Sequence, residues 1–187
     1  MQRFHESHVR EDEIDSLGHM NVRFYMVRVE QANARLFAQF GLDRDAISAA
    51  GARLAQIDTY CRYHREQFPG AALEVHGGVL SVKDTSLVLF YEVSNPVKGE
   101  TAATFIIEYA LLSRAARTAL PLSEAVRKAA RSAVVDLPER GTPRTLRLVQ
   151  PNLNVTMAEL LAKLGDREVF GLMGGRAERE VLAEDCD

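Results

Sequence analysis

The feature that most constrains this chain is a window from Val22 to Phe40 that contains neither glycine nor proline. Apolar residues recur in it at steps of three and four, namely Tyr25, Val29, Ala32, Leu36 and Phe40. This spacing predicts one long helix with a broad face buried in a core. Asn21 is a good N-cap for that helix, and Gly41 supplies the left-handed residue that commonly ends one.

After a short predicted helix over residues 45–50, the apolar period changes from 3.6 to 2. Strands are predicted at residues 57–63, 73–82, 87–93 and 103–111, and residues 4–14 are expected to form a first or edge strand. The short connections between these strands favour an antiparallel meander. Gly77 and Gly78 interrupt one strand and suggest a β-bulge there. We therefore expect an α+β fold in which the long helix lies on one face of an antiparallel sheet.

Three apolar residues, Val88, Phe90 and Ile106, fall on the predicted outer face of the sheet. A sheet face that is fully open to water does not normally carry such a cluster. Either a partner subunit or the C-terminal region of the chain is therefore expected to cover part of this face.

The chain of 187 residues is long enough for one domain and an appendage. The main domain is expected over residues 1–125, with a C-terminal extension of loop and short helices over 126–187. A helix is predicted over 122–131 and a short strand over 145–149. A capping box at Thr156 opens a second short helix that Gly165 closes.

Charge and composition exclude several classes of protein. The 23 Lys and Arg against 26 Asp and Glu give a net charge of −3, which disfavours nucleic acid as the main partner. No apolar run approaches the ~20 residues that span a bilayer, and the N-terminus lacks a secretory signal. Cys61 and Cys186 cannot build a disulfide scaffold, and His5 and His8 would point to opposite faces of a strand. A reduced, cytoplasmic protein without a metal site, membrane contact or cofactor is expected.

The turn before the long helix places a carboxylate (Asp15), an imidazole (His19) and an amide (Asn21) within seven residues. The first N–H groups of a helix have no partner inside it, and the helix dipole favours negative charge at this end. A thioester or ester carbonyl placed there would find an oxyanion site, worth ~2.7–4 kcal/mol for a good donor. A nearby carboxylate can act as nucleophile or as base for water, and Gly18 permits close approach of a substrate.

The motif Asp-x-x-Gly-His-Met-Asn over residues 15–21, followed by a helix with Tyr25 and Glu30, resembles the hotdog-fold acyl-CoA thioesterases of the 4-hydroxybenzoyl-CoA thioesterase type. Residues 59–63, 90–93 and 99–103 are similar to that family's strands, and the resemblance covers residues 4–125. It implies an antiparallel β-sheet wrapped around one long central α-helix, with an extra C-terminal segment.

The resemblance also implies roles for single residues. Asp15 stands at the position of the catalytic carboxylate, and His19 matches a catalytic histidine of related plant thioesterases. The backbone N–H of Val22 would polarise the thioester carbonyl. The expected contacts to the substrate come from Gly18, Asn21, Val22 and Tyr25, although Tyr25 also fits the core stripe. Two positions depart from the family pattern, because Val22 replaces a common second Asn and Leu17 replaces an Asn of the plant enzymes.

Glu30 is a further candidate, since another branch of this fold uses a glutamate on the helix. It follows Val22 by eight residues, about 12 Å along the helix axis, which is far from the same carbonyl. A basic patch is also required to meet the phosphates of coenzyme A (CoA). Candidates for this patch are Arg62, Arg65, Lys83, Arg114 and Arg117.

The predicted function is hydrolysis of an acyl-CoA or acyl-carrier-protein thioester, with Asp15 as nucleophile or general base. The resemblance also implies a homodimer or homotetramer, because hotdog domains pair edge to edge and build their sites at the interface. Two alternatives stay open: a non-catalytic acyl-CoA-binding module, and a hydratase or dehydratase of the same fold. The second is disfavoured because the proline-rich motif after the histidine is missing.

Overall fold

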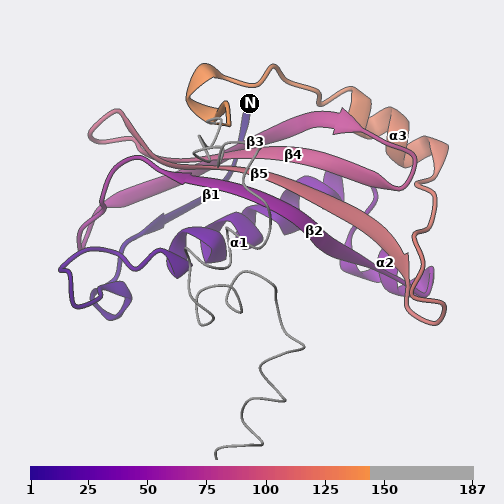
Figure 1. Ribbon diagram of the computed structural model, residues 1–187, viewed down its shortest axis with the longest axis horizontal. Coiled ribbons are helices and arrows are strands. Elements are labelled where there is room, and N and C mark those ends of the chain that lie inside the picture. The colour runs from indigo at the N-terminus through magenta and orange to yellow at the C-terminus, as the bar shows by residue number, and fades with distance from the viewer. Residues whose placement is uncertain (144–187) are drawn as a thin grey trace, which may run out of the picture. The chain divides into compact units, whose positions relative to one another are not determined.

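A computed structural model describes residues 1–143 of the chain. Its central feature is one antiparallel sheet of five strands in the order β1-β3-β4-β5-β2, with a single long helix lying against it (Figure 1). The strands are β1 (Gln2–His8), β2 (Ala52–Tyr63), β3 (Ala72–Val82), β4 (Ser86–Asn95) and β5 (Glu100–Ser113). The predicted α+β architecture, an antiparallel sheet wrapped around one long helix, is therefore confirmed.

The long helix α1 (Arg23–Gln39) begins and ends close to its predicted limits. Its buried face presents the expected apolar stripe to the sheet. At its C-terminus Gly41 has φ +73°, the Gly41 N–H donates to Ala38 O at 3.1 Å, and the Leu42 N–H donates to Phe37 O at 3.0 Å. This pair of bonds is the Schellman motif, so the helix ends where Gly41 predicts. A shorter helix, α2 (Arg44–Ala49), follows at once.

The core around α1 also contains a polar bridge. The side chain of Asn33 is buried, its amide donates to the Tyr109 hydroxyl, and its carbonyl accepts from the Tyr91 hydroxyl. Tyr91 and Tyr109 belong to β4 and β5, so these bonds connect the middle of the helix to two central strands. Because a buried amide without partners is costly, they also fix how α1 is rotated on the sheet.

The N-terminal strand is shorter than predicted, because β1 ends at His8 and the 3₁₀-helix η1 (Glu11–Glu13) follows. The reason lies far along the chain. Arg28 on α1 is buried, and its guanidinium binds the Glu13 carboxylate at 2.6 Å. A buried guanidinium needs a nearby counter-charge. The chain therefore turns toward α1 instead of continuing along the sheet.

The predicted β-bulge at Gly77 and Gly78 is wrong. Both glycines pair regularly with β4, and the register shifts farther on, between Val79 and Ser81. A Cβ atom on Gly77 would lie 2.8 Å from the Tyr91 ring, and one on Gly78 would lie 2.6 Å from Val135. Both glycines therefore allow neighbouring side chains to pack closely against the strand, and neither marks an irregular backbone.

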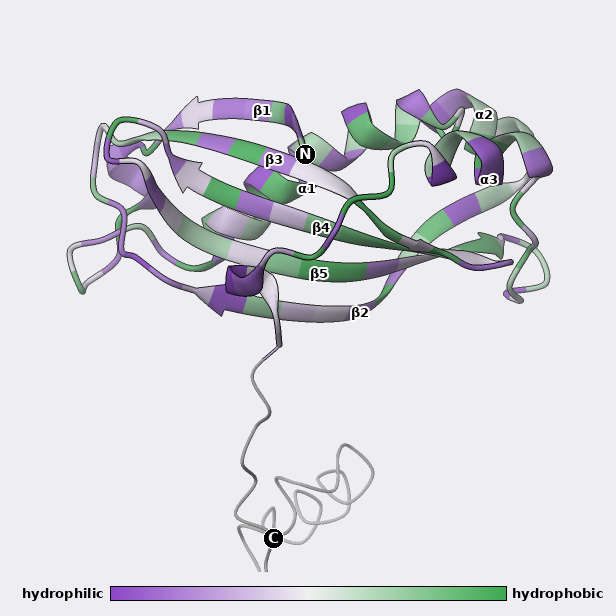
Figure 2. Ribbon diagram, turned by 90° about the horizontal axis from the view of Figure 1, so that it is seen from above, coloured by the Kyte–Doolittle hydropathy of each residue, from purple (hydrophilic) through white to green (hydrophobic). Residues whose placement is uncertain are grey.

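The C-terminal region of the chain itself covers the outer face of the sheet. Helix α3 (Glu124–Arg131) leads into residues 132–143, here called the outer-face segment, which includes the 3₁₀-helix η2 (Glu139–Gly141) and crosses the strands (Figure 2). At its start the segment pairs with the edge of β3, where the Val79 N–H donates to Ala133 O at 3.1 Å and the Val135 N–H donates to Val79 O at 2.8 Å.

Farther along, Arg140 pairs with the nearly buried Glu92, with N–O distances of 2.8 and 2.6 Å. Arg62 donates to the carbonyls of Arg140 and Thr142. Phe90, one of the predicted outer-face residues, is fully buried beneath Gly141. Of the two covers expected for this face, the structure shows the C-terminal one.

Met1–Pro143 form one compact unit, which includes residues 126–143 of the predicted extension. The strand predicted at 145–149 and the helix predicted from Thr156 to Gly165 lie outside the described residues. No helix within residues 1–143 is long and apolar enough to cross a membrane.

The packing of the outer-face segment predicts the effect of truncating Phe90. Phe90→Ala is expected to lower the free energy of unfolding by about 3–5 kcal/mol, because the ring is fully buried. Val97→Ala, at a side chain that is 83% exposed, is the control and should change stability by less than about 0.5 kcal/mol. Urea unfolding measures both. Equal stability of the two variants would show that residue 90 is not covered in solution.

Candidate active site

Hydrogen bonds between residues of the loop before α1 hold this loop in a tight conformation. The Asp15 N–H donates to His19 O at 3.1 Å, and the Gly18 N–H donates to Asp15 O at 3.0 Å. Gly18 has φ +83°, a conformation that side chains other than glycine rarely adopt. The loop therefore reverses the chain within five residues, just before the start of the helix.

The carboxylate of Asp15 is tied to this loop and to Asn21. Its Oδ1 accepts from the Leu17 N–H at 2.9 Å, and its Oδ2 accepts from the Asn21 side-chain amide at 3.2 Å. Asn21 in turn accepts from the Arg23 N–H at 3.1 Å through Oδ1. Asn21 thus links the carboxylate to the first turn of α1.

The predicted N-cap is displaced by one residue, because the helix begins at Arg23 and Val22 occupies the N-cap position. Asn21 nevertheless caps a helix N–H through its side chain. Val22 is 49% exposed. Within residues 1–143 no acceptor bonds to the Val22 N–H, whereas the neighbouring Asn21 N–H donates to Glu13 O and the Arg23 N–H to Asn21. One peptide donor at the helix start is therefore free.

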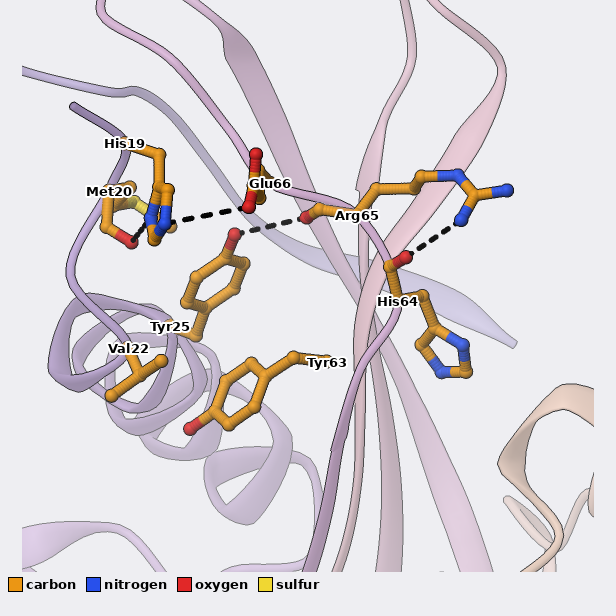
Figure 3. Close-up of a pocket in the computed structure, with 8 residues that line it drawn as sticks. All are labelled: His19, Met20, Val22, Tyr25, Tyr63, His64, Arg65 and Glu66. Carbon is orange, nitrogen blue, oxygen red and sulfur yellow. Dashed lines mark hydrogen bonds and ion pairs between the residues drawn. The ribbon is translucent and has the colours of Figure 1, made fainter. Parts of the chain in front are cut away.

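A cavity of about 340 Å³ opens beside this donor (Figure 3). One wall comes from the loop and the start of α1, and the other from the end of β2 and the residues that follow it. The lining residues are His19, Met20, Val22, Tyr25, Tyr63, His64, Arg65 and Glu66. A concave site with both aromatic and charged groups can hold a small acyl group and a polar carbonyl together.

The imidazole of His19 lies in the wall of this cavity, with 19% of its side chain exposed. Its Nε2 lies 3.5 Å from a carboxylate oxygen of Glu66, and its Nδ1 lies 3.5 Å from the carbonyl oxygen of Met20 (Figure 3). Both ring nitrogens face oxygen acceptors, which fixes the plane of the ring. His19 is therefore oriented toward the cavity by a residue from the opposite wall.

Two tyrosines, Tyr25 and Tyr63, line the cavity next to each other. Tyr25 is 3% exposed, and its hydroxyl donates to Arg65 O at 3.2 Å. Burial, the largest effect, raises the pKa of Tyr25 to about 12, so its hydroxyl stays protonated at neutral pH. The rings of Tyr25 and Tyr63 meet edge to face with centroids 5.3 Å apart. Tyr25 thus has the packing role that the core stripe predicts and also borders the cavity.

The structure brings only some of the sequence-predicted residues together. His19, Val22 and Tyr25 line the cavity, whereas Asp15, Gly18 and Asn21 do not. Asp15 reaches the helix start through Asn21, and Gly18 is exposed in the loop. Glu30 borders a different cavity farther along α1.

Sequence reasoning missed the opposite wall of the cavity. Tyr63 was expected only as a strand residue, Arg65 only as a possible phosphate contact, and His64 and Glu66 had no expected role. The available signal was the end of the predicted strand at residue 63. Side chains placed at a strand end can enter a site, but which site they enter depends on the packing of the sheet.

Comparison with known proteins links this chain to one family. The family model described as the thioesterase-like superfamily matches residues 9–130. The chain is also 35% identical over 102 residues to L-carnitine dehydrogenase/betainyl-CoA thioesterase from Agrobacterium fabrum (strain C58). That match covers 54% of this chain and 21% of the relative, so this chain spans about a fifth of the relative's length.

Solved structures share the fold at low sequence identity. A Staphylococcus aureus protein in complex with CoA matches with TM-score 0.69 and 18% identity, over 76% of this chain and 94% of that one. A 1,4-dihydroxy-2-naphthoyl-CoA thioesterase from Synechocystis matches with TM-score 0.62 and 16% identity, over 70% of this chain and 96% of that one.

The double role of Asn21 predicts a loss of stability on truncation. Asn21→Ala removes the acceptor for the Arg23 N–H and is expected to destabilise the protein by about 0.5–2 kcal/mol. Asn21→Ser keeps a capping oxygen and should retain most of the stability. Urea unfolding measures both variants. If the two lose the same amount, the cap does not contribute to folding.

Proposed function

Because the chain belongs to the thioesterase-like superfamily, we propose that it hydrolyses an acyl-CoA thioester to a free acid and CoA. The observation that carries this proposal is the free N–H of Val22 at the edge of the cavity beside His19. A fixed N–H donor at a helix start is suited to stabilise the negative charge that develops on a carbonyl oxygen.

In the proposed reaction the thioester carbonyl oxygen accepts a hydrogen bond from the Val22 N–H. Asp15 is outside the cavity lining but is bonded to Asn21, next to Val22, and we assign it one of two roles. It either attacks the carbonyl carbon or removes a proton from a water that attacks it. In the first case the carbon–sulfur bond breaks, the thiolate leaves, and water hydrolyses the resulting anhydride. In the second, the water oxygen bonds to the carbonyl carbon, the carbon–sulfur bond breaks, and the leaving thiolate takes up the proton that Asp15 removed. The bonds from Leu17 and Asn21 hold the Asp15 carboxylate in place for either role.

His19 has a supporting role in this mechanism. Its ring lies in the cavity wall, and Glu66 on the opposite wall binds it through Nε2. Its contacts to Glu66 and Met20 are both long, at 3.5 Å, so the imidazole can exchange one of them for a hydrogen bond to the substrate or to the departing thiolate. The Glu66 carboxylate is 65% exposed, so the pair orients the ring rather than contributing much stability.

The first acyl group to test is betainyl, since the curated relative carries betainyl-CoA thioesterase in its name. The betainyl group contains a trimethylammonium cation, and such cations favour aromatic faces and nearby carboxylates. Tyr25, Tyr63 and Glu66 offer these groups around a cavity of about 340 Å³. Acyl carrier protein is the alternative carrier of the acyl group.

We also propose that the protein works in the cytoplasm with either carrier.

The assembly that we propose is a homodimer paired through β2. This strand of twelve residues forms one edge of the sheet, and Ile57 and Tyr63 on it are 55% and 50% exposed. A long open edge of this kind is a template for pairing with a second strand. The outer-face segment disfavours a tetramer built back to back, because it already buries Phe90.

The catalytic proposal predicts a selective loss of turnover in Asp15→Asn. Thiol release is measured over a panel of acyl-CoA esters that includes betainyl-CoA, and kcat is expected to fall at least about a hundredfold. The fold should persist, because an asparagine oxygen can still accept from the Leu17 N–H.

Asp12→Asn is the matched control, since Asp12 is an exposed carboxylate paired with Arg10, and its kcat should stay within about twofold of wild type. Wild-type protein that binds acyl-CoA but releases no thiol would instead support the non-catalytic binding module. Turnover unchanged in Asp15→Asn would remove Asp15 from the mechanism.

The dimer proposal predicts the mass of the protein in solution. Light scattering at micromolar concentration should give twice the 20.8 kDa of one chain. Thr59→Pro, in the middle of β2, should shift this mass toward one chain, because proline removes a backbone donor from the strand. A wild-type mass of one chain would refute the dimer, and a mass of four chains would refute the blocking role of the outer-face segment.

A further inference from the structure

Gln67 is a fully buried polar residue that the proposed reaction does not use. It directly follows the residues that form the opposite wall of the proposed active site. Its side-chain Oε1 accepts from the Asn95 amide at 2.9 Å, and its Nε2 donates to the Glu100 carboxylate at 3.2 Å. A buried amide is costly unless it is hydrogen-bonded, so these two bonds determine where Gln67 lies.

Both partners of the Gln67 side chain belong to the connection between β4 and β5. Asn95 is buried at the end of β4, and Glu100 begins β5 opposite it. The Oδ1 of Asn95 accepts from the N–H groups of Val97 and Lys98, both at 3.1 Å. The Asn95 side chain therefore closes this turn and holds Gln67 at the same time.

The backbone of Gln67 bonds to the loop before α1. Its carbonyl oxygen accepts from the N–H of the buried Met20 at 2.7 Å. Met20 lines the cavity from the side of this loop, whereas Gln67 continues the segment that follows β2. This hydrogen bond therefore connects the two parts of the chain that form the walls of the cavity.

Both oxygen acceptors around the His19 ring are attached to Gln67. The Met20 carbonyl oxygen, 3.5 Å from Nδ1, belongs to the residue whose N–H Gln67 binds. The Glu66 carboxylate, 3.5 Å from Nε2, belongs to the residue directly before Gln67 (Figure 3). Contacts of 3.5 Å are at the long end of the hydrogen-bonding range. The ring therefore keeps both acceptors only while Met20 and Glu66 stay in place.

We propose that Gln67 is a positioning residue, which sets the orientation of the His19 ring by holding Met20 and Glu66 on its two sides. This role rests on the function proposed above for His19, whereas the orientation of the ring is measurable without a substrate. Gln67 does not line the cavity, so it acts through these neighbours and not on the acyl group. Misplacement of a reacting group by about 1 Å can lower a rate about a hundredfold.

The first test replaces the amide of Gln67 by a thioether of similar length. Gln67→Met removes both side-chain hydrogen bonds, so the backbone bond to Met20 loses its support. Proton–nitrogen NMR correlation spectra report the tautomer and hydrogen bonding of each histidine ring, and His19→Gln identifies the His19 signals. We expect the His19 signals to shift in Gln67→Met, while those of His5 on β1 and His76 on β3 stay unchanged.

Kinetics with the acyl-CoA that the wild type hydrolyses fastest give a second measurement. Because Gln67 lies outside the cavity lining, kcat is expected to fall at least about tenfold in Gln67→Met, while KM stays within about twofold. Gln39→Met is the matched control, since Gln39 is an exposed residue of α1 whose side chain donates to Gln2. It should leave the His19 signals and both kinetic constants unchanged.

Two further variants decide the question if Gln67→Met fails to fold. Glu100→Ala, at a side chain that is 28% exposed, removes the acceptor of the Gln67 amide and should also shift the His19 signals. Gln67→Glu/Glu100→Gln exchanges donor and acceptor between the two side chains. Both hydrogen bonds at position 67 are then available again, so this double variant should keep the wild-type His19 signals.

His19 signals that are the same in the wild type, Gln67→Met and Glu100→Ala would overturn the inference. Signals that shift equally for all the histidine rings would do the same, because they indicate a general loosening of the fold and not a local role. If the wild type hydrolyses no thioester, the proposed function fails, while the ring signals still decide whether Gln67 orients His19.

Discussion

The burial of α1 against the sheet is the constraint on which the rest of the structure depends. The stripe of apolar residues fixes one face of the helix, and the bonds from Asn33 to Tyr91 and Tyr109 fix its rotation. The Schellman motif at Gly41 fixes its end. Because both ends of the helix are then set in space, the free Val22 N–H and the cavity beside it occupy a defined place rather than a mobile surface.

Local patterns were sufficient to predict most of the fold. The 3.6-residue period predicted α1 almost to the residue, and alternating apolar residues predicted the four strands from β2 to β5. The burial itself does not alternate in β4, which is buried along almost its whole length. The misses involve partners far along the chain. β1 ends early because Glu13 pairs with the buried Arg28, and Gly78 is small because Val135 packs against it. No local signal contains such contacts.

The sequence likewise predicted only the part of the candidate site that is local in the chain. His19 belongs to the loop before α1, and Val22 and Tyr25 belong to the start of the helix. Because the three are close in sequence, a short motif could predict that they lie together. The other wall, from Tyr63 to Glu66, lies about forty residues later, and only the packing of β2 beside α1 brings it there. For Asp15 the motif predicted a carboxylate near the helix start, and the structure adds that Asn21 connects the two.

The arginines illustrate why residue type alone does not define a role. Arg28 is buried and holds η1 against α1, and Arg62 and Arg140 fasten the outer-face segment to the sheet. In each case the guanidinium is satisfied by a carboxylate or a carbonyl of the chain. Arg44 and Arg53 have no such partner within the described residues, although they border a cavity. An unpaired guanidinium group retains its capacity to bind an external anion, whereas one that is bonded to a carboxylate or carbonyl of the chain has lost most of it.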